Sequence, residues 1–167
     1  MTVELGEATA NTPLNLREQV GERALIAWAL EAVEAVAERL PRWCGYTDGS
    51  SNPRMLLTLL TYSYAMGTYG SEDVELSCRR EAGARYISAN MCPDQDIIRH
   101  FRRANLPWVE ECLARVYAKA LGLNPAELGW AEAVPPDNAT SWSARLRDCA
   151  RRTVERAILF DVAMNDY

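Results

Sequence analysis

The segment Met55–Met66 constrains the fold most, because its residues are apolar nearly all round. Asn52 and Pro53 precede it, a pair that is typical of the N-cap and the first position of a helix. Gly67 follows it and ends the pattern. A helix without a polar face is buried on every side, so the sequence predicts a helix over residues 53–66 at the centre of a helical core. The run is too short for a membrane span, which takes roughly 20 apolar residues.

In the rest of the chain, apolar residues recur at steps of three and four, which is the spacing of one helix face. No segment alternates apolar and polar residues as a half-buried strand does. The sequence therefore predicts an all-α fold of about seven helices, in which the short helices between residues 71 and 104 form a helix-turn-helix-like cluster. Besides the central helix, the predicted helices cover residues 22–40, 71–80, 84–87, 94–104, 107–121 and 141–164. Ser71 and Asp94 are the expected N-caps of the helices that begin beside them.

Helix-breaking residues divide the chain into four parts. An irregular segment over residues 1–20 precedes a helical domain over 21–123, and a linker over 124–140 contains Pro135-Pro136. The last part, over 141–167, is an amphipathic helix that is expected to pack on the domain or on a partner. Its predicted apolar seam is Leu146, Ala150, Thr153, Ala157 and Phe160, and that of the first helix is Leu25, Ala29, Ala32, Val33, Val36 and Leu40.

The composition is that of a globular protein, with 49% hydrophobic and 25% charged residues among 167. Lys and Arg number 18 against 23 Asp and Glu, and the formal net charge of −5 argues against a general nucleic-acid binder. Residues 51–120 nevertheless hold 9 basic and 8 acidic side chains, which leaves room for a local basic patch. The N-terminus lacks the basic and apolar regions of a secretory signal, so we expect a cytoplasmic protein without membrane contact.

The five cysteines offer little chemistry, because no two of them have the paired spacing of a zinc site. Cys112 and Cys149 fall on apolar helix stripes, where a cysteine acts as a small core residue. A thiol enzyme that pairs Cys78 or Cys92 with His100, the only histidine, is the weakest hypothesis, since no nucleophile, base and orienting group match in spacing. The acidic residues form no two-metal pattern either, so we expect no metal and no cofactor.

The predicted helix over 94–104 carries the most suggestive polar face of the chain. One side of it is apolar and would dock it on the core, while the opposite side carries basic side chains that suit phosphates or base edges. The alternative is that these side chains solvate a surface helix or pair with acidic residues such as Glu110 and Glu111. The docking residues are Ile97, Ile98 and Phe101, and the residues predicted to face solvent are Arg99, His100, Arg102 and Arg103.

A second basic stripe lies on the last helix, where Arg145, Arg152 and Arg156 share one side. This stripe suits a phosphate backbone, but we favour ion pairs with the acidic first helix, within one chain or across a dimer. Asp148 and Arg152 also form a favourable pair one turn apart on the same helix.

A series of short motifs runs through the middle of the chain: Asn52–Leu57, Tyr62–Gly67, Gly70–Glu75, Cys78–Glu81, Tyr86–Ala89 and Pro93–Arg103. In this order they resemble the InsH-type N-terminal domain of insertion-sequence transposases, over about residues 20–123 and most clearly over 51–106. That family has a Pro-Arg-Met-Leu-Leu helix, a turn with Tyr and Gly, a Ser-Ser-Arg-x-Leu-Glu segment with a Cys-Arg element, and a Pro-Asp-His-x-Thr-Ile-x-x-Phe-Arg-Arg signature. Ile97 stands where the family usually has Thr.

The resemblance implies a helical domain that binds the terminal DNA of a transposon and precedes an RNase H-like catalytic domain. The catalytic domain of the family carries an Asp-Asp-Glu metal site for cleaving and joining DNA strands. No Asp-Gly-Thr-type first catalytic strand follows Gly122 in this sequence. We therefore expect no catalysis from this chain.

Together these observations predict a transposase-derived DNA-binding domain that recognises transposon-end DNA, such as terminal repeats. The alternative is a protein-interaction or dimerisation module that descends from a transposase, has lost DNA binding, and pairs with a second copy or with a transposase. The predicted DNA contacts are Arg99, His100, Arg102 and Arg103, with Arg79, Arg80 and Arg54 as lesser backbone contacts.

Overall fold

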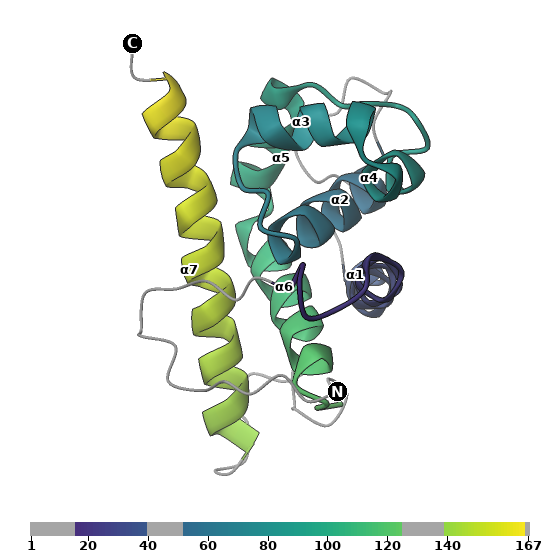
Figure 1. Cartoon of the computed structure of the whole chain (residues 1–167). Coiled ribbons are helices and arrows are strands. Elements are labelled where there is room, and N and C mark those ends of the chain that lie inside the picture. Colours follow the sequence, from purple (N-terminus) through teal and green to yellow (C-terminus); the bar gives the residue numbers. More distant parts are fainter. Residues whose placement is uncertain (1–15, 40–51, 125–138, 166–167) are drawn as a thin grey trace.

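The computed structural model describes residues 16–39, 52–124 and 139–165, and these ranges hold seven helices and no strand. The predicted all-α class is therefore confirmed, and the helices surround α2 (Figure 1). Leu40, Cys44 and most of the predicted linker lie outside the described residues. The helices are α1 (Glu22–Ala37), α2 (Pro53–Ala65), α3 (Ser71–Arg80), α4 (Ala82–Ile87), α5 (Gln95–Ala104), α6 (Leu106–Ala120) and α7 (Ala139–Asn165).

Helix α2 is the centre of the core, as its apolar run predicts. Every residue from Leu56 to Ala65 is buried, and the helix contacts α1, α4, α5, α6 and α7. The Asn52 side chain accepts a hydrogen bond from the Arg54 backbone N–H, so the predicted N-cap is confirmed. The buried hydroxyl of Thr61 donates to the Leu57 carbonyl one turn earlier, so this polar group is satisfied inside the core.

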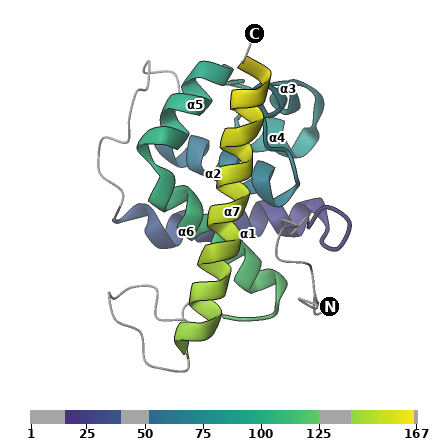
Figure 2. The same cartoon turned by 90° about the vertical axis from the view of Figure 1, so that its left-hand side faces the viewer.

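Helix α6 lies between α1 and α7, and it contacts both of them extensively (Figure 1). Figure 2 shows α7 crossing in front of the other helices along its whole length. A three- and four-residue repeat of apolar residues keeps one face of each helix toward the core. The buried residues include the predicted Leu25, Ala29, Val33 and Val36 on α1 and the predicted Leu146, Ala150, Thr153 and Ala157 on α7, together with Val109, Cys112, Leu113 and Val116 on α6. Val154 of α7 is also buried, although the predicted seam leaves it out.

Two details of these helices differ from the prediction. Gly70, and not Ser71, is the N-cap of α3, and the Ser71 hydroxyl donates instead to Asp161 of α7. Phe160 does not belong to the buried seam of α7, because 42% of it is exposed. Asp161, four residues after Ala157, takes the inward position. None of the helices in the described ranges is long and apolar enough to cross a membrane.

The short helix α4 is fixed by a close approach at Gly83. The Glu22 carboxylate of α1 accepts hydrogen bonds from the Gly83 backbone N–H at 2.9 Å and from the Tyr62 hydroxyl at 3.2 Å. A negative group at this place suits the partial positive charge of a helix N-terminus. A Cβ atom on Gly83 would lie 2.5 Å from the Tyr62 hydroxyl oxygen and closer still to the carboxylate. Glycine is therefore required here by space, where α1, α2 and α4 meet.

We expect Gly83→Ala to lower the free energy of unfolding by about 1–3 kcal/mol, because the added methyl group displaces the Glu22 carboxylate and crowds a buried ring. Urea unfolding followed by circular dichroism measures the change. Gly21→Ala is the matched control, since no atom lies within 4 Å of a Cβ placed on Gly21. Equal stability of the two variants would contradict the close approach at Gly83.

Candidate nucleic-acid interface

Helix α5 packs antiparallel to α3 and presents its basic face beside it. At its start, the Gln95 backbone N–H donates to Glu75 of α3 at 3.0 Å. At its end, Arg102 and Ser71 of α3 reach the same carboxylate on α7. The Asp94 side chain accepts from the backbone N–H groups of residues 96 and 97, so Asp94 caps α5 as its sequence predicts. The docking face is buried as predicted through Ile97, Ile98 and Phe101.

The loop that leads into α5 has an uncommon backbone. Ala89, Asn90 and Cys92 have φ angles of 49°, 62° and 37°, in the region that residues other than glycine rarely adopt. The Cys92 thiol donates to the Cys78 carbonyl at 3.3 Å and so ties this loop to α3. Conformations of this kind persist only where the surrounding structure holds them, and they are concentrated at functional sites.

Three of the predicted contacts lie on the solvent side of the α3–α5 pair. Arg99, whose side chain is 21% exposed, donates to Gln95 at 3.1 Å and to Asp96 at 2.8 Å. His100 is exposed, and its Nδ1 atom lies 2.7 Å from the Asp96 carbonyl oxygen. Arg103 is exposed one turn after Arg99. These groups stand at helical spacing, so they can follow a phosphate backbone along one line.

Arg79 of α3 extends this face. Its guanidinium donates to Glu75 Oε1 at 3.0 Å, and the second oxygen of the same carboxylate accepts from α5. Arg79 therefore lies beside the N-terminal end of α5. We call Arg79, Arg99, His100 and Arg103 the α5 face.

Arg102 does not face solvent, and this part of the prediction is wrong. Its side chain is only 6% exposed, and its guanidinium donates to Asp161 of α7 at 2.6 Å and to the Tyr64 hydroxyl at 3.2 Å. Burial works to lower the pKa of Arg102, but its contacts with Tyr64 and Asp161 raise that pKa overall, so the charge is kept. The physical reason for the difference is that α7 covers this flank of α5.

Asp161 gathers donors from two other helices. Its carboxylate accepts from the Ser71 backbone N–H at 2.8 Å, from the Ser71 hydroxyl at 2.6 Å and from Arg102. We call Arg102, Asp161, Ser71 and Tyr64 the buried clasp. One signal in the sequence could have revealed it: Asp161 is an acidic residue on the apolar side of a long helix, where a carboxylate needs a buried basic partner.

We expect Asp161→Ala to lower the free energy of unfolding by about 3–5 kcal/mol, because it leaves the Arg102 charge buried without its carboxylate. Thermal and urea unfolding measure the loss. The double variant Arg102→Met with Asp161→Leu should recover most of it, since no buried charge remains. Asp148→Ala, which removes a partly exposed carboxylate from the same helix, should cost no more than about 1 kcal/mol. A similar cost for Asp161→Ala would rule out the clasp as a major source of stability.

The other two predicted contacts lie away from the α5 face. Arg54 pairs with Glu34 of α1 at 3.2 Å, at the opposite end of α2 from Tyr64. Arg80 lines a groove between α3 and α7. The predicted contacts therefore do not form a single continuous surface.

Two arginines of the basic stripe on α7, Arg152 and Arg156, have partners on α7 itself or in the 66–70 turn. Asp148 pairs with Arg151 and, at 2.9 Å, with Arg152, which confirms the predicted pair one turn apart. Arg156 lies over the Tyr69 ring, with its guanidinium carbon 5.8 Å from the ring centroid. These contacts are made within α7 or with the 66–70 turn, and so differ from the ion pairs with the first helix that the sequence favours.

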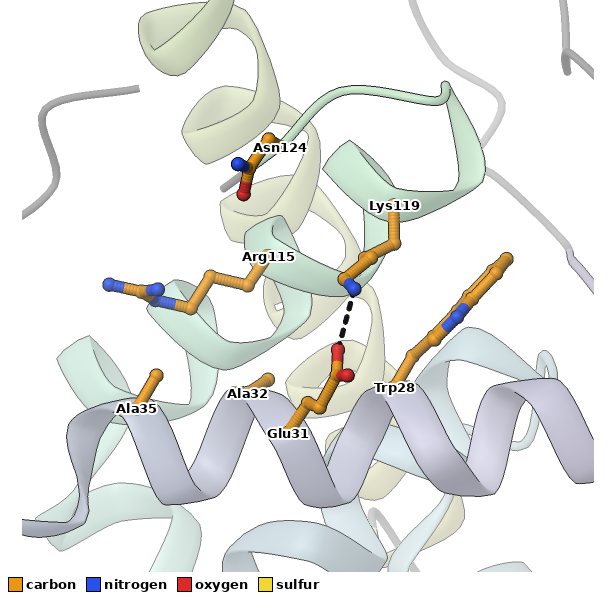
Figure 3. Close-up of a pocket in the computed structure, with 7 residues that line it drawn as sticks. All are labelled: Trp28, Glu31, Ala32, Ala35, Arg115, Lys119 and Asn124. Carbon is orange, nitrogen blue, oxygen red and sulfur yellow. Dashed lines mark ion pairs between the residues drawn. The ribbon is translucent and has the colours of Figure 1, made fainter. Parts of the chain in front are cut away.

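A hollow of about 210 Å³ lies between α1 and α6 (Figure 3). Trp28 forms one wall, and Lys119 reaches across to Glu31 with a distance of 2.7 Å between Nζ and Oε2. Figure 3 shows that Arg115 points away from this ion pair. Because the lysine is already paired with a carboxylate, the hollow presents little positive charge to an anion.

Two buried cysteines of the described chain are poor nucleophiles. Burial raises the pKa of Cys78 to about 11 and that of Cys112 to about 12, so both thiols stay protonated at neutral pH. Among the described residues, no group of three His, Cys, Asp or Glu side chains is placed to hold a metal ion.

Comparisons with family models, with curated proteins and with solved structures found no match to this chain.

Proposed function

We propose that this chain binds duplex DNA through the α5 face. The observation that carries the proposal is the solvent-facing line of Arg99, His100 and Arg103 on a helix whose opposite side is buried. Arginines at helical spacing on such a helix can reach phosphates and, through their two-pronged guanidinium groups, guanine edges. The resemblance of the Pro93–Arg103 segment to the transposase signature supports the same ligand. The proposal includes that α3, α4 and α5 together form a helix-turn-helix-like cluster.

The acidic groups beside these arginines limit the strength of the interaction. Glu75 and Asp96 pair with Arg79 and Arg99, and a phosphate has to replace them as partners. Ion pairs at a protein surface contribute about 0–1 kcal/mol each, so a DNA backbone can displace these carboxylates at little cost. We therefore expect binding that is local, weak and strongly weakened by salt.

The buried clasp supports this function without touching the DNA. It joins the C-terminal end of α5 to α3 and α7, so the arginines of the α5 face stand on a helix that is fixed at both ends. A helix held in this way loses little further freedom when it binds, which favours affinity. In this proposal Arg102 is a positioning residue, and Arg103 beside it contacts the DNA.

Fluorescence anisotropy with a labelled duplex at low salt tests the proposal. We expect the double variant Arg99→Ala with Arg103→Ala to bind about tenfold more weakly, and the slope of log K against log salt to fall by about 1 for each arginine that contacts a phosphate. Arg23→Ala and Arg147→Ala are matched controls, since they remove exposed arginines from α1 and α7. Unaltered binding by the double variant, or no duplex binding at low salt, would refute the α5 face as a DNA interface.

A second candidate function is association with another copy of this chain. Near the end of α7, Leu159 and Val162 are 66% and 52% exposed, and their spacing of three residues places them on one face of the helix. Apolar side chains gathered at one place on a surface favour a protein contact. This observation favours the dimerisation module over a plain surface helix.

Sedimentation equilibrium tests the association. If the end of α7 is an interface, the wild-type chain should sediment as a dimer, and Leu159→Glu with Val162→Glu should sediment as a folded monomer. Glu155→Gln on the same side of α7 is a control that should leave the dimer intact. A monomeric wild-type chain at high micromolar concentration would exclude this second function.

A further inference from the structure

A groove of about 520 Å³ lies between α3, the 66–69 turn and the last turns of α7. It is separate from the α5 face, because it opens on the other side of α3, beside Ser77 and Arg80. Its walls combine cationic and aromatic side chains, namely Arg17, Arg80, Arg156, Tyr69 and Phe160. Arginine beside aromatic rings is the side-chain set that proteins use for the charged backbone and the flat bases of unpaired nucleotides.

The three arginines of the groove come from three different parts of the fold. Arg17 precedes α1, and its Nε donates to the Met66 carbonyl at 3.2 Å, which holds its guanidinium at the edge of the groove. Arg80 is exposed in the last turn of α3. Arg156 reaches in from α7 over the Tyr69 ring. Three segments far apart in the sequence thus deliver positive charge to one place.

The aromatic wall is partly open to solvent. Tyr69 packs between Tyr64 and Phe160, with ring centroids 6.4 Å and 5.8 Å apart. Tyr64 is fully buried and anchors the stack in the core, whereas Phe160 remains 42% exposed at the outer end. The core does not account for an exposed ring in that position, but a flat ligand stacked on it would cover it.

We propose that this groove binds a nucleotide unit, with the base stacked on Phe160 and the guanidinium of Arg156, and the phosphate held by Arg17 and Arg80. The shared chemistry is that of a free nucleoside phosphate and of a single-stranded DNA segment. The site is largely formed in advance, because Asp161 of the buried clasp follows Phe160 directly and fixes this part of α7 against Ser71.

Two carboxylates in the walls of the groove affect how tightly it binds and which base we expect it to prefer. Asp73 and Glu81 line the groove, and Glu81 lies 3.6 Å from Arg17 in an exposed pair. Three arginines against two carboxylates leave one excess positive charge, so binding is weak and falls with salt. A carboxylate accepts a hydrogen bond from the exocyclic amino group of cytosine, adenine or guanine, which thymine lacks. A base with such an amino group therefore fits these walls better than thymine, and cytosine is the smallest of them.

Anisotropy with a labelled oligodeoxycytidine strand, and competition by dCMP, test the groove. We expect Phe160→Ala and Arg156→Ala each to weaken binding of the strand by about tenfold, which is within the range for loss of one stacking contact. Met164→Ala and Arg147→Ala are matched controls on the same helix, outside the groove. Circular dichroism establishes that each variant is folded.

The source of the nucleotide follows from the competition. If dCMP displaces the strand, a single nucleotide is sufficient for binding. If dCMP does not displace it, the groove binds a strand. Either result supports the proposal, provided that Phe160→Ala and Arg156→Ala weaken binding. The double variant Arg99→Ala with Arg103→Ala separates this site from the α5 face, since it should keep strand binding while its duplex binding weakens. No strand binding, or binding that both groove variants retain, overturns the proposal.

Discussion

The charge of Arg102, buried among four helices, is the constraint on which most of the structure depends. Taking a guanidinium out of water is costly unless a carboxylate and further hydrogen bonds replace the solvent. Asp161 supplies that carboxylate from α7, while Ser71 at the start of α3 and Tyr64 of α2 complete the set. Moving any one of these partners away would leave a buried charge or polar group without a hydrogen bond. The clasp therefore fixes where the end of α7 lies and how α5 is oriented.

The sequence predicted the helices well because their determinants are local. Helical spacing, the Asn52 and Asp94 caps and the apolar run of α2 each act within a few residues, and each is confirmed in the structure. The clasp could not be derived in the same way, since Arg102 and Asp161 are 59 residues apart. Helical spacing alone cannot decide whether an arginine on the flank of a helix meets solvent or another helix. Ser71 was misplaced as a cap for the same reason.

The candidate surfaces depend on which residues tertiary packing brings together. Arg79 and Arg99 lie in separate motifs, and only the antiparallel packing of α3 on α5 places both beside Glu75 and Gln95. Arg54, which lies in the first of these motifs, pairs instead with Glu34 of α1. The sequence therefore identifies the basic residues. Which of them belong to the α5 face and which to the groove can be known only from the packing of the helices.

Helix α3 separates two kinds of positive surface by simple geometry. Consecutive residues on a helix point about 100° apart, so Arg79 and Arg80 serve the α5 face and the groove respectively. The α5 face is a line of side chains on a convex helix and suits the regular backbone of a duplex. The groove is concave and has an aromatic wall, which a stacked duplex cannot enter but an unpaired base can. In a chain whose net charge is −5, neither surface would attract nucleic acid from a distance, so shape and local pairing would have to discriminate between the two proposed ligands.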